Sequence, residues 1–322
     1  MSKILEVNHL KKYFNVSQGV LHAVDDVSFS IDRGETLGVV GESGCGKSTL
    51  GRTLLNLIDA TSGEVLFKGK NITNITKGAA FVEQRKKMQL IFQDPFASLD
   101  PRKCVFDAIA EPLRVHKVCR NSEELKKEVN ALMEKVGLAQ RLTFSYPHEL
   151  DGGRRQRIGI ARALALKPEF IVCDEPVSAL DVSIQAQILN LMQDLQEEMG
   201  LTYVFITHDL SVVKHISNDI MVMYLGKVVE KCEADELFEK TLHPYSKALL
   251  AAIPVPSVKD RKKRELIRGE VSSPINPKPG CRFAPRCPYA TEACFGETPD
   301  LEEVLPGHFV ACHHTREIND LA

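Results

Sequence analysis

A glycine-rich stretch near the N-terminus carries the most specific chemistry in this sequence. It reads Gly41-Glu42-Ser43-Gly44-Cys45-Gly46-Lys47-Ser48-Thr49, with the G-x-x-x-x-G-K-S spacing of a phosphate-binding loop. Glycines let backbone N–H groups curl around a polyphosphate, and the start of a following helix adds partial positive charge. Lys47 is expected to reach the β- and γ-phosphates, and the Ser48 hydroxyl to ligate Mg²⁺. The stretch therefore predicts a polyphosphate site.

Polar side chains that suit phosphoryl transfer follow three other apolar stretches. An Asp at a strand end beside a phosphate loop, as expected for Asp174, can hold Mg²⁺ through water. The adjacent Glu175 is placed to orient or deprotonate an attacking water. Gln93 ends the stretch that begins at Met88, where it either bonds a magnesium-bound water or caps a turn, and its spacing leaves both open. His208 ends a further stretch, at the kind of sheet edge where ligands gather.

The elements that must position these residues predict an α/β fold with a largely parallel sheet. Apolar and alternating patterns predict strands over 4–31 with a loop at 17–19, and over 36–40, 63–67, 88–93, 169–174 and 203–207. Helical spacing predicts helices over 50–58, after a cap at Asn121, over 154–166 and over 182–199. The region around 96–148 is expected to be a helical insertion between two halves of the sheet domain.

Composition limits the classes of function. The 322 residues carry a formal net charge of -2, so no overall positive field attracts nucleic acid. No apolar run approaches the length of a membrane span, and the N-terminus lacks a signal-peptide core. We therefore expect a cytoplasmic protein whose contact with a membrane goes through a partner. A linker is expected over 254–279, and its basic run Arg261-Lys262-Lys263-Arg264 is interpreted as solvated because acidic residues flank it.

Four of the nine cysteines lie in the last 42 residues: Cys281, Cys287, Cys294 and Cys312, separated by 5, 6 and 17 residues. Thiolates at this spacing suit an iron–sulfur cluster. They also suit Zn²⁺, with His308, His313 and His314 as alternative ligands. A disulfide pair is less favoured in a reducing compartment. The other five cysteines, Cys45, Cys104, Cys119, Cys173 and Cys232, are interpreted as packing residues.

Taken together, these motifs resemble the ATP-binding subunit of an ABC transporter over residues 4 to about 255. The resemblance implies an ABC-type P-loop NTPase with a RecA-like core, an antiparallel β subdomain and a helical subdomain over about 94–165. It implies that Gly41, Ser43, Gly44, Cys45, Gly46, Lys47, Ser48, Thr49 and Asp174 bind ATP, with Mg²⁺ held by Ser48, Gln93 and Asp174. Glu175 resembles the catalytic glutamate, Gln93 the Q-loop glutamine and His208 the switch histidine. Tyr13, which taken alone fits a core aromatic, looks like the adenine-stacking residue. Ser178, Ala179, Leu180 and Asp181 are similar to the D-loop.

One subgroup fits best, the oligopeptide/dipeptide/nickel importer ATPases. The resemblance lies in the runs Phe92–Arg102 and His243–Leu250 and in the cysteine tail, so it covers nearly the whole chain. It implies a cassette over 1–255 and a Cys-rich extension over 256–322 that holds a [4Fe-4S] cluster, which it favours over zinc. It also implies a second ATPase subunit, two permeases and an extracytoplasmic substrate-binding protein, with this chain peripheral at the cytoplasmic face of the membrane. Alternatives are a nickel-chelate importer ATPase and an ABC ATPase that acts on ribosomes or DNA.

The sequence departs from the family in its signature loop, which usually reads Leu-Ser-Gly-Gly-Gln. Here it reads Leu150-Asp151-Gly152-Gly153-Arg154. In this family the loop faces the γ-phosphate bound by the opposite subunit, so Asp151 would set a negative charge against negative oxygens. At ~4 Å and an effective dielectric near 20, each such repulsion is about 4 kcal/mol before screening. We therefore expect two unequal ATP sites, with Arg154 offsetting part of the repulsion.

Overall fold

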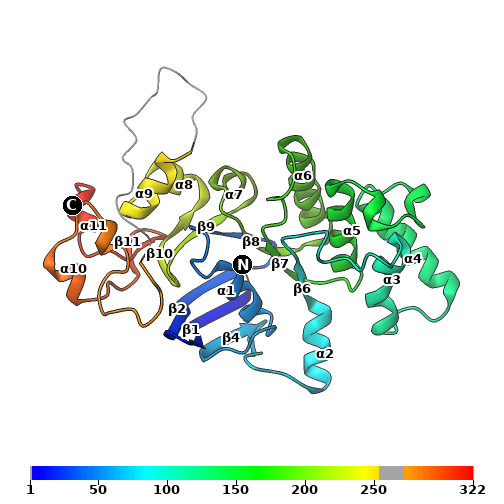
Figure 1. Ribbon diagram of the computed structural model, residues 1–322, viewed down its shortest axis with the longest axis horizontal. Coiled ribbons are helices and arrows are strands. Elements are labelled where there is room, and N and C mark those ends of the chain that lie inside the picture. The colour runs from blue at the N-terminus through cyan, green and yellow to red at the C-terminus, as the bar shows by residue number, and fades with distance from the viewer. Residues whose placement is uncertain (1, 254–271, 322) are drawn as a thin grey trace. The chain divides into compact units, whose positions relative to one another are not determined.

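A computed structural model describes residues 2–253 and 272–321 of the protein (Figure 1). The chain divides into two compact units. The first comprises Met1–Ser2, Asp32–Glu35 and Ile75–Val204, and the second Lys3–Ile31, Thr36–Asn74 and Phe205–Ala322. The predicted boundary between residues 255 and 256 and the basic run 261–264 lie outside the described residues. The described residues that follow them, 272–321, belong to the same unit as the phosphate-binding loop.

The second unit begins with a four-stranded sheet in the order β2-β1-β4-β5 (Figure 1). Its strands are β1 (Lys3–Val16), β2 (Gly19–Asp32), β4 (Ser62–Phe67) and β5 (Lys70–Asn71). β1 pairs with β4, and β4 with β5, in antiparallel register. Val27, Phe29 and Ile31 are buried and alternate with more exposed residues, as half-buried strands require. The predicted antiparallel β subdomain is therefore confirmed.

The larger sheet of the second unit is mixed, so the prediction of a largely parallel sheet is wrong for its C-terminal part. β3 (Thr36–Val40) is fully buried and pairs in parallel with β9 (Asp219–Tyr224). β9 then pairs antiparallel with β10 (Lys227–Glu233). The two residues between these strands, Leu225 and Gly226, both have positive φ, which is the backbone of a tight hairpin and joins only antiparallel neighbours. The sheet continues through β12 (His308–Val310) to β11 (Glu302–Leu305), both antiparallel.

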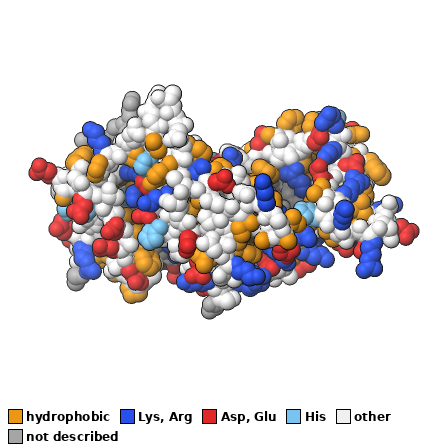
Figure 2. Space-filling model, turned by 90° about the horizontal axis from the view of Figure 1, so that it is seen from below, with side chains coloured by type: hydrophobic (Ala, Val, Ile, Leu, Met, Phe, Trp, Pro, Cys, Tyr) orange, Lys and Arg blue, Asp and Glu red, His pale blue; other side chains and the backbone are white. Residues whose placement is uncertain are grey.

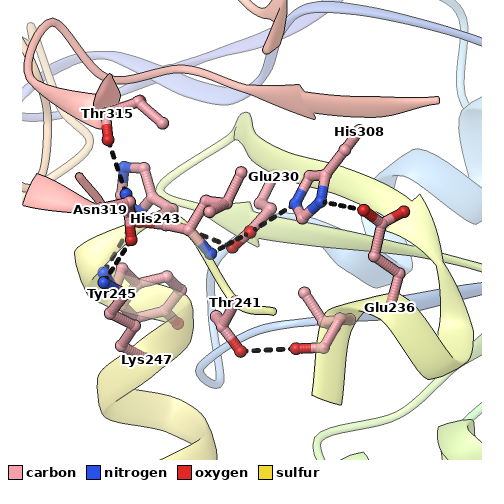
Figure 3. Close-up of polar contacts among 11 residues, drawn as sticks. Glu230, Glu236, Thr241, His243, Tyr245, Lys247, His308, Thr315 and Asn319 are labelled. Atoms are coloured by element: carbon pink, nitrogen blue, oxygen red, sulfur yellow. Dashed lines mark hydrogen bonds and ion pairs between the residues drawn. The ribbon is translucent and has the colours of Figure 1, made fainter. Parts of the chain in front are cut away.

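A buried polar network holds β12 against the rest of the unit (Figure 3). His308 and Glu230 are both 0% exposed, and His308 Nε2 lies 2.8 Å from Glu230 Oε1. His308 Nδ1 lies 3.2 Å from Glu236 Oε1 on the other side of the ring. The Glu230 carboxylate also accepts the backbone N–H groups of Leu242, at 2.7 Å, and His243, at 3.2 Å. The described tail that carries β12 is thus joined to β10 by buried hydrogen bonds rather than by a linker alone.

This network predicts a pH-dependent contribution to stability. Burial lowers the pKa of His308, but the hydrogen bonds and charges of Glu230 and Glu236 outweigh burial and raise it above its ordinary value. The stabilisation is therefore fully present below the unfolded pKa of about 6.5 and is lost as pH rises through the folded pKa. We expect His308→Gln to cost about 3 kcal/mol at pH 6 and less at pH 9, measured by thermal unfolding. The exposed His148→Gln is the control, and an equal cost at both pH values would contradict the linkage.

The first unit is mainly helical. β6 (Met88–Ile91) and β7 (Phe170–Asp174) pair in parallel. The Asn121 side chain accepts the Glu124 N–H at 2.8 Å, so the predicted cap begins its helix as expected. The predicted helix over 182–199 is also confirmed, and Gly200 ends it in a left-handed conformation. The helices of this unit are α2 (Gly78–Lys87), α3 (Val105–Val115), α4 (Ser122–Lys135), η1 (Gln140–Leu142), η2 (Pro147–Glu149), α5 (Gly152–Leu164) and α6 (Val182–Met199).

The second unit carries shorter helices around its strands. They are α1 (Lys47–Leu54), α7 (Leu210–Ile216), α8 (Ala234–Glu239), α9 (Pro244–Ala251), η3 (Ala284–Arg286), α10 (Glu292–Gly296) and α11 (Thr315–Ile318). β8 (Thr202–Ile206) contributes residues to both units. Across the described ranges, none of the helices has the length and apolar character needed to cross a bilayer. Basic and acidic side chains are interspersed over the face shown in Figure 2.

Candidate ATP site

The predicted phosphate-binding loop connects β3 to α1 in the second unit. Gly41 has φ 152° and Gly46 has φ 107°, conformations that favour glycine. A Cβ on Gly41 would lie 2.2 Å from the Met223 carbonyl oxygen, and one on Gly46 would lie 2.0 Å from that of Ala23. Both glycines are therefore required by close backbone contacts. At the tip of the loop, Ser43 and Gly44 are exposed, where their backbone is accessible to a phosphate.

Lys47 is folded into this loop. Its side chain is only 5% exposed, and its Nζ donates to the carbonyl oxygens of Gly41, at 2.7 Å, and Glu42, at 2.9 Å. Cys45 packs behind it, and burial raises the pKa of the thiol, which favours the neutral form. Ser48 and Thr49, in the first turn of α1, are half-buried. The loop thus holds the ammonium group on two of its own carbonyl oxygens, which keeps a positive charge where the motif predicts a polyphosphate.

Tyr13 lies in a polar cluster of the same unit. Its ring stacks on that of His22, with centroids 3.9 Å apart, and its hydroxyl donates to Asp25. Arg282, from the C-terminal extension, forms an ion pair with the same carboxylate. Burial raises the pKa of Asp25, but the Tyr13 hydrogen bond and the Arg282 charge outweigh it and hold the pKa below its ordinary value. His22 covers one face of the Tyr13 ring, so the predicted stacking on adenine would have to use the opposite face.

Gln93 and Glu175 come together in the first unit. Asp174, the last residue of β7, is 2% exposed. Glu175 follows with φ 47°, a left-handed conformation that is uncommon for a side chain of this size. Gln93 Nε2 donates to Glu175 Oε2 at 2.9 Å. The amide therefore fixes one carboxylate oxygen of the residue predicted to act on water.

The signature-loop residues begin α5, also in the first unit. The helix was expected from Arg154 and begins at Gly152 instead, because Asp151 is its N-cap and accepts the Arg154 N–H at 2.8 Å. The Asp151 carboxylate thus satisfies one of the N–H groups at the helix start. Arg154 Nη1 lies 3.4 Å from Asp151 Oδ2, so its guanidinium partly neutralises that charge. Leu150 is buried beside them.

The predicted D-loop lies beside the start of α5. A Cβ on Gly152 would approach Leu180 at 3.0 Å, and one on Gly153 would approach Ile184 at 2.6 Å. Ser178 Oγ donates to the Glu175 carbonyl at 3.1 Å. Ser178, Ala179 and Asp181 are exposed. His208 belongs to the second unit, where it follows β8 and is exposed.

The four tail cysteines line one pocket with His243, Phe283, His313 and His314. All nine cysteines are free thiols, so the less favoured disulfide is not formed. Burial raises the pKa of Cys281 to about 11 and raises those of Cys287 and Cys312, which favours thiols over thiolates. Among residues 2–253 and 272–321, no group of three or more His, Cys, Asp or Glu is arranged to hold a metal ion. The described residues therefore give no support to the predicted iron–sulfur cluster or to Zn²⁺, although the four thiols share a pocket. His308 lies outside that pocket and bonds Glu230 and Glu236 instead.

Several residues around the phosphate-binding loop were not found from the sequence. The Glu42 carboxylate bonds Arg286 of the extension, at 2.9 and 3.1 Å, and the Glu42 N–H donates to Tyr245 Oη at 2.9 Å. Tyr245 lies in the run from His243 that marked the subgroup, but no role was assigned to it. Arg282 and Arg286 lie next to Cys281 and Cys287, and no sequence motif marks either arginine.

Comparison with known proteins agrees with this fold. The family model described as "ABC transporter" matches residues 24–178, and "Oligopeptide/dipeptide transporter, C-terminal region" matches residues 229–294. The chain resembles the dimeric post-hydrolysis structure of the ATP-binding cassette MJ0796 bound to ADP and Pi, with TM-score 0.65 and 29% identity. That likeness covers 71% of this chain and 98% of the other. A structure of cbiO1 from Clostridium perfringens matches with TM-score 0.66 and 28% identity, over 74% of this chain and 92% of the other.

The chain therefore belongs to the ABC transporter family, as one of its ATP-binding cassette ATPases. Among curated relatives, the oligopeptide transport ATP-binding protein AppF of Bacillus subtilis is 52% identical, over 96% of this chain and 97% of that protein. The oligopeptide transport ATP-binding protein OppF of the same organism is 53% identical, over 96% of each. OppF of Haemophilus influenzae is 51% identical, again over 96% of each.

Proposed function

We propose that this protein is the ATP-hydrolysing subunit of an ABC importer for oligopeptides or dipeptides. The observation that carries the proposal is identity near 50% over nearly the full length with oligopeptide transport ATP-binding proteins. The match of residues 229–294 to the transporter-specific C-terminal region supports the same branch of the family. Energy for transport would come from hydrolysis of ATP held by the phosphate-binding loop.

In this proposal the residues share the work of phosphoryl transfer. Lys47 leaves its backbone acceptors to neutralise the β- and γ-phosphates. Glu175 orients and deprotonates the attacking water, and Gln93 holds the carboxylate in place. Mg²⁺, when bound with ATP, supplies further neutralising charge, and Ser48, Asp174 and Gln93 would hold it. Tyr13 would contact the adenine, and His208 and the D-loop residues would act when two cassettes close.

The proposed assembly has four further components. They are a second homologous ATPase subunit, two permeases and an extracytoplasmic substrate-binding protein, with this chain on the cytoplasmic face of the membrane. The dimeric state of the structurally similar MJ0796 cassette supports the pairing of two cassettes. The permeases and the binding protein, rather than this chain, would select the cargo.

Co-purification of the tagged full chain from native membranes tests the proposal. We expect permease subunits and a second cassette to be recovered, and ATP hydrolysis by the complex to rise with peptide. Recovery of ribosomes or DNA instead would favour the alternative class of ABC ATPase. Stimulation by a nickel chelate and not by peptides would favour the nickel importer.

We also propose that the two ATP sites of the assembly are unequal. The partner's γ-phosphate would face Asp151, whose charge Arg154 only partly neutralises. Asp151→Ser keeps an N-cap oxygen for the Arg154 N–H, so thermal stability is expected to change by less than about 1 kcal/mol. ATP turnover at the partner's site is expected to rise about tenfold. It is measured in complexes in which Glu175→Gln has inactivated the site built on this chain's own phosphate-binding loop. Unchanged turnover with unchanged stability would show that Asp151 does not limit the partner's site.

A further inference from the structure

We propose that the C-terminal extension positions the phosphate-binding loop, and that Arg286 does so by neutralising and orienting Glu42. This inference rests on the proposed function, because it assigns a role in ATP binding at the same loop. All the residues involved lie in the second unit. The segment around η3 that carries Arg286 also carries Cys281 and Cys287, but the inference does not depend on a metal.

Glu42 is bonded through three of its groups. Its carboxylate forms a two-pronged ion pair with Arg286, with N–O distances of 2.9 and 3.1 Å. Its N–H donates to Tyr245 Oη, and its carbonyl oxygen accepts from Lys47 Nζ. Glu42 therefore links the extension, α9 and the phosphate-binding lysine. A shift of Glu42 would move the backbone that holds Lys47.

The charges explain why Glu42 needs a partner. A carboxylate inside a phosphate-binding loop repels the β- and γ-phosphates that Lys47 is meant to attract. The Arg286 side chain is only 7% exposed, so solvent screens this pair weakly. A planar guanidinium bonded to both carboxylate oxygens cancels the charge and fixes its direction. Arg286 and Glu42 are 244 positions apart in the sequence, so the pair is a long-range contact of the fold.

Aromatic packing holds Arg286 and Tyr245 in place. Phe283, from the extension, packs on Tyr224 and Tyr245, each with ring centroids 5.4 Å away. Tyr224 and Tyr245 pack on each other at 4.6 Å, and Tyr224 Oη accepts from Arg286 Nη1 at 3.2 Å. The three rings are almost fully buried. A buried aromatic cluster of this kind fixes side-chain directions, so the ion pair does not rely on flexible surface residues.

Arg282 makes a second contact of the same kind. Its guanidinium donates to the Leu225 carbonyl and pairs with Asp25, which accepts the Tyr13 hydroxyl. The extension therefore reaches both the phosphate-binding loop and the aromatic proposed to lie at the adenine. The two arginines are four residues apart, which makes one short segment responsible for both contacts.

The test is the equilibrium binding of Mg²⁺-ATP to the full chain, measured by titration calorimetry together with thermal unfolding. Arg286→Gln is expected to weaken binding about tenfold, because it leaves the Glu42 charge unpaired. Lys278→Gln removes one positive charge from an exposed position of the extension and is expected to leave binding unchanged. Glu42→Gln combined with Arg286→Gln is expected to restore binding to within about threefold, because no unpaired carboxylate remains. Arg286→Lys keeps the charge and provides a variant that folds if Arg286→Gln does not.

The inference is overturned if Arg286→Gln binds Mg²⁺-ATP as tightly as Lys278→Gln, or if the double variant does not recover binding. Where Arg286→Gln does not fold, Arg286→Lys is compared with Arg286→Lys combined with Glu42→Gln. Equal binding by these two variants would also overturn the inference. A purely structural role for Arg286 would lower stability without recovery of binding in the double variant. Lys47→Ala separates this failure from that of the proposed function. If Lys47→Ala weakens binding and Arg286→Gln does not, only the role of the extension is rejected. If Lys47→Ala binds as tightly as the unmodified chain, the ATP site itself is wrongly placed.

Discussion

Replacing Glu175 by Gln is expected to lower ATP hydrolysis by the assembled transporter at least 100-fold while Mg²⁺-ATP affinity changes less than about threefold. A general base contributes roughly 10²- to 10⁴-fold to a proton transfer, and an amide cannot take that proton. Gln at position 175 keeps the size of the side chain and an oxygen able to accept from Gln93 Nε2. Binding is retained because the phosphate-binding loop is unchanged.

The measurement is the steady-state release of phosphate with saturating ATP, together with calorimetric binding. Glu197→Gln is the matched control, because Glu197 is an exposed glutamate of α6 in the same unit. The positive φ of Glu175 belongs to the backbone, so the Gln variant experiences the same strain and the comparison isolates the carboxylate. Retention of the normal rate in the Glu175 variant would remove Glu175 from the mechanism.

Lys47→Ala is expected to weaken binding of Mg²⁺-ATP by the full chain at least 100-fold. The ammonium is the one side-chain charge that the loop sequence places for the β- and γ-phosphates. Its loss also releases the carbonyl groups of Gly41 and Glu42, so the empty loop is expected to loosen. Calorimetric titration measures the affinity, with the exposed Lys70→Ala as control. Affinity within threefold of the unmodified chain would contradict the assignment.

Local sequence patterns predicted the elements whose stability is local. The Asn121 cap, the helix that ends at Gly200 and the buried strand over 36–40 each depend on residues within a few positions of one another. The phosphate-binding loop was found for the same reason, because its motif is contiguous. Asp151 carried such a local signal as well: an Asp before two glycines and a helix is a typical N-cap. The same carboxylate therefore has two properties, a charge that would face a phosphate and a capping bond to the Arg154 N–H.

Contacts distant in sequence were not predictable from periodicity. The ion pair of Arg286 with Glu42, and that of His308 with Glu230, join residues 244 and 78 positions apart. Each pairs a buried charge with a partner that only the folded chain brings near. The antiparallel pairing of β10 with β12 also joins residues that are distant in the sequence, such as Glu230 and Val310. The spacing of the four tail cysteines likewise does not determine whether they bind a metal, because ligand geometry depends on how the tail folds, and the described residues show no group arranged to hold one.

We propose that Lys47 binds and Glu175 helps to cleave the same ATP, and that this cleavage drives transport. The most direct test is ATP-dependent uptake of labelled peptide into proteoliposomes that contain the assembled transporter. We predict that Lys47→Ala and Glu175→Gln each reduce uptake to the level seen without ATP. Uptake by the Lys47→Ala transporter at a rate near that of the unmodified complex would contradict the claim.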